Sequence, residues 1–134
     1  MENRQSIILV VDDNPTNLKL ISDVLEFEGH RIIKARDAEE AQLVIARAVP
    51  DLILMDIALP GMDGLTMTRK LKADEKTKHI PVVALTAFAM KGDQQTAQAA
   101  GCDGYITKPI DTRQLPVQVA EILQRTAAPE TKGT

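Results

Sequence analysis

Five short apolar segments alternate with stretches of helical periodicity along the chain. In those stretches apolar residues recur at spacings of three and four, as at Leu18, Ile21 and Leu25, which is the pattern of a helix with one buried face. Strand and helix therefore alternate five times, and this order predicts a parallel sheet covered by helices on both faces. The predicted strands are Ile7–Val11, Arg31–Ala35, Leu52–Met55, Pro81–Leu85 and Tyr105–Thr107.

Residues that start and stop helices fall between these segments. Asn14 is a candidate N-cap and is followed by Pro15, which suits the first helical position. Three helices end where a glycine or proline follows the periodic stretch, namely at Gly29, Pro50 and Gly101.

The composition of the strands predicts their order in the sheet. The first, third and fourth strands are unbroken apolar runs, as expected of strands buried on both faces. The second and fifth carry or adjoin polar residues, which edge strands tolerate. The simplest right-handed solution is the order 2-1-3-4-5, a flavodoxin-like (βα)5 doubly wound sandwich.

Composition and charge narrow the class of protein. The 134 residues suit one domain, which we expect over 5–124, with a disordered polar tail over 125–134. The formal net charge is −3, so no basic surplus points to nucleic acid. No apolar run is long enough for a membrane span, and the lone Cys102 fits a reducing cytoplasm. We expect a cytoplasmic monomer or weak dimer with no nucleic-acid or membrane partner.

Acidic residues follow two strands that the predicted order makes neighbours. Asp12 and Asp13 follow the first strand, and Asp56 follows the third. The strand order reverses between these two strands, and ligands of such sheets bind at the carboxyl ends of the strands at that point. Three carboxylates in one crevice repel one another unless a cation lies among them. Oxygen ligands favour a hard divalent ion, so the sequence predicts Mg²⁺ here.

Two further strand ends complete the predicted site. Thr86 ends the fourth strand and offers a hydroxyl group, and Lys108 follows the fifth. The charges of the three carboxylates, Mg²⁺ and Lys108 sum to zero, so the site can receive a phosphoryl anion. One carboxylate must then be the nucleophile, and Asp56 on the middle strand is the best candidate. Each residue alone also has an ordinary explanation, as a helix cap, a turn residue or a surface charge; their joint placement favours the functional interpretation.

These residues lie within motifs that resemble a known family. Four segments resemble the response-regulator receiver domains of two-component systems, the CheY-like superfamily: Val10–Asn14, Leu54–Gly64, Ala84–Ala87 and Lys108–Pro109. The resemblance covers about residues 5–124. Two segments resemble in particular DivK-type stand-alone regulators and the receivers of hybrid kinases: Thr86–Asp93 and Gly101–Tyr105.

The resemblance implies roles for the individual residues. Asp56 is the phosphoacceptor. Asp13 and Asp56 ligate Mg²⁺ directly, the backbone carbonyl of Ala58 adds a ligand, and Asp12 orients metal-bound water. Thr86 and Lys108 contact the phosphoryl group, and the bend after Lys108 is a cis bond to Pro109.

The resemblance also implies how the phosphoryl group becomes a signal. Thr86 moves toward it, and Tyr105 turns inward; a half-exposed edge tyrosine is the alternative at that position. The helix from about Asp93 to Ala100 has few large apolar residues, so weak packing suits it to shift between two states. The readout face is then the fourth helix, the fifth strand and the fifth helix, with Phe88 and Met90 as candidate members. Ala58, which has no polar group to orient water, predicts slow self-hydrolysis.

We therefore expect a single-domain response regulator, a switch rather than an enzyme. Its donor is a sensor histidine kinase or a histidine phosphotransfer protein, and its output is a downstream protein target. A haloacid-dehalogenase phosphatase needs Asp-x-Asp on one strand, and Asp56-Ile57-Ala58 lacks the second aspartate. An FMN-binding flavodoxin needs a Ser/Thr-rich phosphate loop after the first strand, whereas this chain has Asp12-Asp13-Asn14-Pro15 there, which would repel phosphate. A non-phosphorylated pseudo-receiver, a phosphate sink and a receiver cut from a hybrid kinase remain as alternatives.

Overall fold

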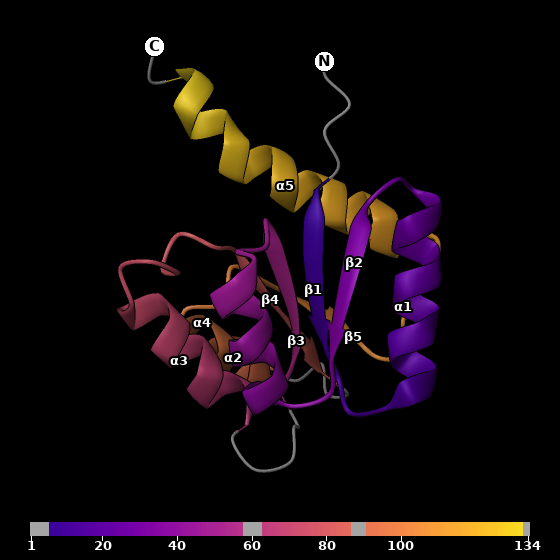
Figure 1. Cartoon of the computed structure of the whole chain (residues 1–134), viewed down its shortest axis with the longest axis horizontal. Coiled ribbons are helices and arrows are strands. Elements are labelled where there is room, and N and C mark those ends of the chain that lie inside the picture. The colour runs from indigo at the N-terminus through magenta and orange to yellow at the C-terminus, as the bar shows by residue number, and fades with distance from the viewer. Residues whose placement is uncertain (1–5, 58–62, 87–90, 133–134) are drawn as a thin grey trace.

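A five-stranded sheet lies between two layers of helices (Figure 1). The computed structural model describes residues 6–57, 63–86 and 91–132. Strands and helices alternate from the first element to the last, as the hydrophobic pattern predicts. The elements are β1 (Ile7–Val11), α1 (Pro15–Phe27), β2 (Arg31–Ala35), α2 (Ala38–Arg47), β3 (Leu52–Asp56), α3 (Gly64–Ala73), β4 (Val82–Thr86), α4 (Lys91–Ala100), β5 (Gly104–Thr107) and α5 (Gln114–Lys132).

The strand order β2-β1-β3-β4-β5 confirms the predicted flavodoxin-like fold. Every neighbouring pair is parallel. The central strands β3 and β4 are buried along their whole length, because helices cover them on both faces. The edge strand β2 leaves Arg31 and Lys34 exposed, as its polar residues indicate. Strand ends differ from the predicted ones by one residue, so that β3 includes Asp56 and β4 includes Thr86.

Alternate residues of the strands pack into two separate hydrophobic cores, one on each face of the sheet. On one face, Leu18, Ile21 and Leu25 of α1 pack with residues of α5 against the even-numbered residues of β1 and β3. On the other, α2 and α3 pack against the odd-numbered residues of the same strands. This alternation follows from the two-residue period of a strand, and it decides which side chains at the strand ends share a face.

Local signals set the ends of α1 and α4. The Asn14 side chain accepts hydrogen bonds from the backbone N–H groups of Thr16 and Asn17, at 2.9 and 3.1 Å, which confirms the predicted N-cap. Gly29 and Gly101 have φ angles of 97° and 103°, a conformation that glycine adopts without steric cost. Both glycines follow the ends of helices, as the sequence predicts.

The carboxyl end of the chain differs from the expected tail. Helix α5 continues to Lys132, so most of residues 125–134 is helical rather than irregular. Gln124, Arg125, Ala127 and Ala128 have high helix propensity and extend a helix that is already nucleated, whereas Pro129 does not favour the last turn. Among the described residues, none of the helices has the length and apolar character needed to cross a membrane.

Candidate functional site

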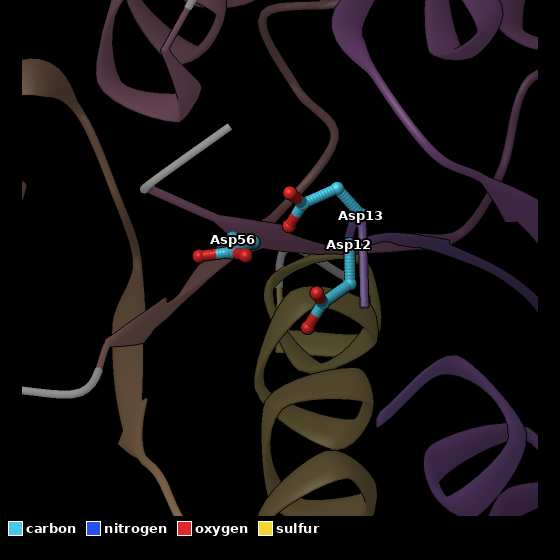
Figure 2. A group of neighbouring side chains, drawn as sticks. All are labelled: Asp12, Asp13 and Asp56. Carbon is cyan, nitrogen blue, oxygen red and sulfur yellow. The ribbon is translucent and has the colours of Figure 1, made fainter. Parts of the chain in front are cut away.

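Pairing of β1 with β3 brings the three aspartates together. Val11 lies opposite Met55 in the register, so Asp12, the next residue, lies beside Asp56. Carboxylate oxygens of Asp12, Asp13 and Asp56 lie within 4.8 Å of one another. Figure 2 shows the three carboxylates gathered where β1 and β3 end. The crevice thus forms where the strand order reverses, as the topology predicts.

Two of these carboxylates are buried, and one lysine faces both. Asp12 and Asp56 are 0% and 3% exposed, whereas Asp13 is exposed. The Nζ atom of Lys108 lies 3.2 Å from Oδ2 of Asp12 and 3.2 Å from Oδ2 of Asp56. Strand alternation explains the contact, because Asp12, Asp56 and Lys108 continue the side of the sheet that packs on α1 and α5. The lysine therefore bridges the two buried acids.

Backbone contacts fix the position of Lys108. Its N–H donates to the carbonyl oxygen of Thr86 at 2.7 Å, which continues the pairing of Thr86 with Thr107. The Lys108–Pro109 peptide bond is cis, as the resemblance implies. The backbone of Lys108 is therefore held at the carboxyl end of β4 and β5.

Burial and neighbouring charges shift the pKa values of Asp12 and Lys108. Burial raises the pKa of Asp12 above 3.8, and the Asp56 charge adds to the rise, while the Asn14 N–H and Lys108 oppose it. Burial alone lowers the pKa of Lys108, but the charges of Asp12 and Asp56 outweigh it, so the pKa lies above 10.5. The lysine stays protonated, and the acidic crevice carries excess negative charge.

Asp12 also has a structural contact. Its Oδ1 accepts a hydrogen bond from the N–H of Asn14 at 2.9 Å, while Asn14 itself caps α1. Asp12 thus accepts a hydrogen bond within the turn before α1, as the alternative explanation allows, whereas the N-cap of the helix is Asn14. The second oxygen of Asp12 faces the crevice and Lys108.

The donor set fits a hard divalent cation. All three side chains offer carboxylate oxygens, the ligands that Mg²⁺ prefers. Three aspartates and one lysine leave a net charge of about −2 when ionised, which one such ion would balance. Ligands of one octahedral Mg²⁺ lie at most about 4.2 Å apart, so a small closure of the 4.8 Å cluster brings them into reach. Ala58, the expected backbone ligand, lies outside the described residues, as do Phe88 and Met90.

The predicted switch residues share one face of the sheet. Thr86 pairs with Thr107, and Tyr105 precedes Thr107 by two, so Thr86 and Tyr105 are diagonal neighbours on the same side. Thr86 is 3% exposed and Tyr105 is 38% exposed. Tyr105 lies with Ala97 and Gln98 of α4 around a small hollow. The tyrosine therefore stands between the strand end and α4.

Sequence reasoning missed a contact made by Gly64, the first residue of α3. Its N–H donates to the carbonyl oxygen of Ile57 at 3.3 Å, which brings α3 back against the end of β3. The pair Asp63-Gly64 signals a turn and a helix start. It does not reveal which strand the helix start touches, because that depends on the tertiary fold.

The fold and the site define a class of protein, a doubly wound α/β domain with an acidic, lysine-bridged crevice at the switch point. Residues 8–120 match the family model of the response regulator receiver domain, so the chain belongs to that family. The polar-differentiation response regulator DivK of Brucella ovis is 48% identical over 103 residues, which cover 77% of this chain and 84% of that protein.

Solved structures agree with this membership. A CheY-like response regulator receiver domain protein from Methanospirillum hungatei superposes with a TM-score of 0.85 at 30% identity, covering 93% of this chain and 98% of that one. The chemotaxis response regulator CheY4 of Vibrio cholerae gives 0.82 at 26% identity, covering 92% and 99%. The family resemblance drawn from the sequence motifs is thereby confirmed.

Proposed function

We propose that this chain is a single-domain response regulator that accepts a phosphoryl group on Asp56 in the presence of Mg²⁺. The donor is a phosphohistidine of a sensor histidine kinase or of a histidine phosphotransfer protein. One observation carries the proposal: Asp56 and Asp12 are buried carboxylates bridged by Lys108 at 3.2 Å, beside a third carboxylate. A purely structural ion pair with Lys108 would need only one carboxylate, whereas three lie together here.

The transfer needs little from the protein beyond position and charge. A carboxylate oxygen of Asp56 attacks the phosphorus atom, an O–P bond forms, and the P–N bond of phosphohistidine breaks with its electron pair left on the imidazole nitrogen. Mg²⁺, when bound, neutralises the charge that develops on the phosphoryl oxygens. Asp12 and Asp13 would hold that ion with Asp56.

Lys108 and Thr86 receive the transferred group. Lys108 is protonated and points at Asp56, so on phosphorylation its ammonium group can exchange the Asp56 carboxylate for a phosphoryl oxygen. Thr86 ends the neighbouring strand, one position beyond Leu85, which pairs with Asp56. Its hydroxyl group is the second donor of the proposed site.

The signal passes through Thr86 to the face formed by α4, β5 and α5. Thr86 and Tyr105 share one side of the sheet, and Tyr105 borders α4. A movement of Thr86 toward the phosphoryl group would open space for the Tyr105 ring and change the surface beside it. A downstream protein then reads that surface, in a monomer or weak dimer acting in the cytoplasm.

Two alternatives keep the same fold. A pseudo-receiver would not take up the phosphoryl group, and a phosphate sink would take it up without a downstream partner. The intact set of Asp12, Asp13, Asp56, Thr86 and Lys108 favours a phosphorylated receiver over the first. A partner protein that binds only the phosphorylated form would distinguish a signalling receiver from a phosphate sink.

The test is the intact mass after incubation with Mg²⁺ and a small acyl phosphate. The wild type is expected to gain one phosphoryl group, and Asp56→Asn none. Asp23→Asn, on the exposed surface of α1, is the matched control and should gain the group as the wild type does. Absence of any gain in the wild type, with the acyl phosphate and with a cognate kinase, would overturn the proposal.

A further inference from the structure

The start of α3 packs directly on the backbone that carries Asp56. Gly64 is buried, and its N–H donates to the carbonyl oxygen of Ile57 at 3.3 Å. Asp63 caps the helix by accepting a hydrogen bond from the N–H of Thr66 at 2.8 Å. The first residue of α3 is therefore hydrogen-bonded to the residue that directly follows the candidate acceptor, Asp56.

Only glycine fits at this position, because no room exists for a side chain. A Cβ atom on residue 64 would overlap the backbone oxygen of Asp56 and lie 2.8 Å from Cα of Ile57. Both neighbours are backbone atoms, which cannot rotate away as a side chain can. The requirement is one of space, since the φ angle of Gly64 is not in the positive region where glycine is favoured.

The helix start cannot retreat from the strand without disturbing the core. The buried hydroxyl group of Thr68 donates to the carbonyl oxygen of Gly64 at 2.8 Å, which fixes the first turn of α3. Met67, in the same turn, is fully buried in the core beneath the sheet. The end of β3 is held as well, since the N–H of Ile57 donates to the carbonyl oxygen of Leu85 at 3.2 Å, so a Cβ at residue 64 is expected to strain both sides of the contact and to shift the backbone that carries Asp56.

A displacement of Asp56 would disturb the whole crevice. Its carboxylate must stay near Lys108 Nζ, at 3.2 Å, and within 4.8 Å of the oxygens of Asp12 and Asp13. We infer that Gly64 is a positioning residue for the phosphorylation of Asp56: its missing side chain lets α3 set the place of the acceptor. This inference rests on the proposed function.

The experiment compares Gly64→Ala with a glycine that has room. Gly104 is the matched control, since a Cβ there would meet Ile122 Cδ1 at 3.5 Å and Val83 Cγ2 at 4.0 Å, which are ordinary contacts. Urea unfolding first establishes a temperature at which both variants are folded. The rate of phosphorylation by an acyl phosphate is then measured by intact mass, and Mg²⁺ affinity by calorimetry.

Gly64→Ala is expected to be phosphorylated about tenfold more slowly or worse, because small misplacements of a reacting group have large effects on rate. It should also bind Mg²⁺ more weakly, whereas Gly104→Ala should match the wild type in both within about twofold. A merely structural role of Gly64 would lower stability without changing the rate or the Mg²⁺ affinity of the folded protein. Folded Gly64→Ala with wild-type values of both would overturn the inference.

Two further arms keep the test decisive. If Gly64→Ala shows no cooperative unfolding, Thr68→Val replaces it, because this change loosens the first turn of α3 without adding a clash. A drop in rate of about fivefold or more in Thr68→Val supports the inference, and a rate and Mg²⁺ affinity within about twofold of the wild type overturn it. If the wild type and Gly104→Ala accept no phosphoryl group, the proposed function fails, and the Mg²⁺ titration alone decides the role of Gly64.

Discussion

Replacing Lys108 by methionine should lower the free energy of unfolding, and Mg²⁺ should restore part of that loss. The ammonium group of the lysine lies within ion-pair distance of both Asp12 and Asp56, at 3.2 Å from each. With an effective dielectric constant of about 20, each contact is worth about 5 kcal/mol before desolvation. Loss of the ammonium group leaves two buried carboxylates facing each other.

The net loss is smaller than these contacts suggest. The Lys108 side chain is 20% exposed, and its removal also removes the cost of burying part of a charge. Removing one partner of a buried pair costs about 3–5 kcal/mol, and partial exposure puts this case near the lower end. We expect a loss of about 3 kcal/mol in the free energy of unfolding without Mg²⁺, or about 10 °C in Tm.

The assay is urea unfolding of wild type and Lys108→Met at pH 8, in chelator and in saturating Mg²⁺. Because a divalent cation among the carboxylates replaces the missing positive charge, the loss should fall by more than half in Mg²⁺. Lys19→Met is the matched control, since Lys19 and Asp23 form an exposed ion pair whose loss should not be measurable. Equal effects of the two variants, with no dependence on Mg²⁺, would show that Lys108 does not balance the charge of the buried carboxylates.

Three further predictions concern the rim of the site, a titrating histidine and a helix cap. Asp13→Asn should weaken Mg²⁺ binding about tenfold in a calorimetric titration, with unfolding in chelator little changed, because Asp13 is exposed; unchanged affinity would count against Asp13 as a ligand. Burial holds the pKa of His30 below 6.5, so the unfolded chain binds the proton more tightly and the free energy of unfolding should fall as pH is lowered through 6.5. His30→Gln should remove that fall and the exposed His79→Gln should keep it, in urea titrations at several pH values; a fall that persists in His30→Gln would contradict the assignment. Asn14→Ala should cost about 1 kcal/mol of unfolding free energy, because two N–H groups of α1 lose their acceptor, and a loss too small to measure would mean that the cap is dispensable.

The strand ends show why so much of the site could be predicted. Asp12, Asp56, Thr86 and Lys108 all follow or end apolar segments that the sequence marks as strands. Once strand order is set by which segments are fully apolar, parallel pairing brings their carboxyl ends to one edge. The gathering of the three carboxylates therefore follows from pattern and topology, without any knowledge of side-chain packing.

Contacts between distant segments could not be predicted in this way. Lys72 of α3 forms an ion pair with Asp103 at 2.9 Å and donates to the Ile80 carbonyl oxygen at 2.7 Å, although 31 positions separate Lys72 from Asp103. The approach of Gly64 to Asp56 is of the same kind. Neither leaves a periodic signal, because each depends on how helices pack on the sheet.

The extent of α5 illustrates a different limit. The polar residues after Leu123 predict a disordered tail, yet the helix continues to Lys132. Polarity indicates that a segment has no core to join, but it does not exclude that residues such as Gln124, Arg125 and Ala127 extend a helix that has already formed. Composition alone therefore did not place the end of the helix.

Peptide mapping can locate the residue that carries the phosphoryl group. The wild type is treated with an acyl phosphate and Mg²⁺, the acyl phosphate bond is reduced with borohydride, and the modified residue is located by peptide sequencing. We predict modification at Asp56 alone. Modification at Asp12, Asp13 or Asp63 in place of Asp56, or at no residue, would show that Asp56 is not the phosphoacceptor.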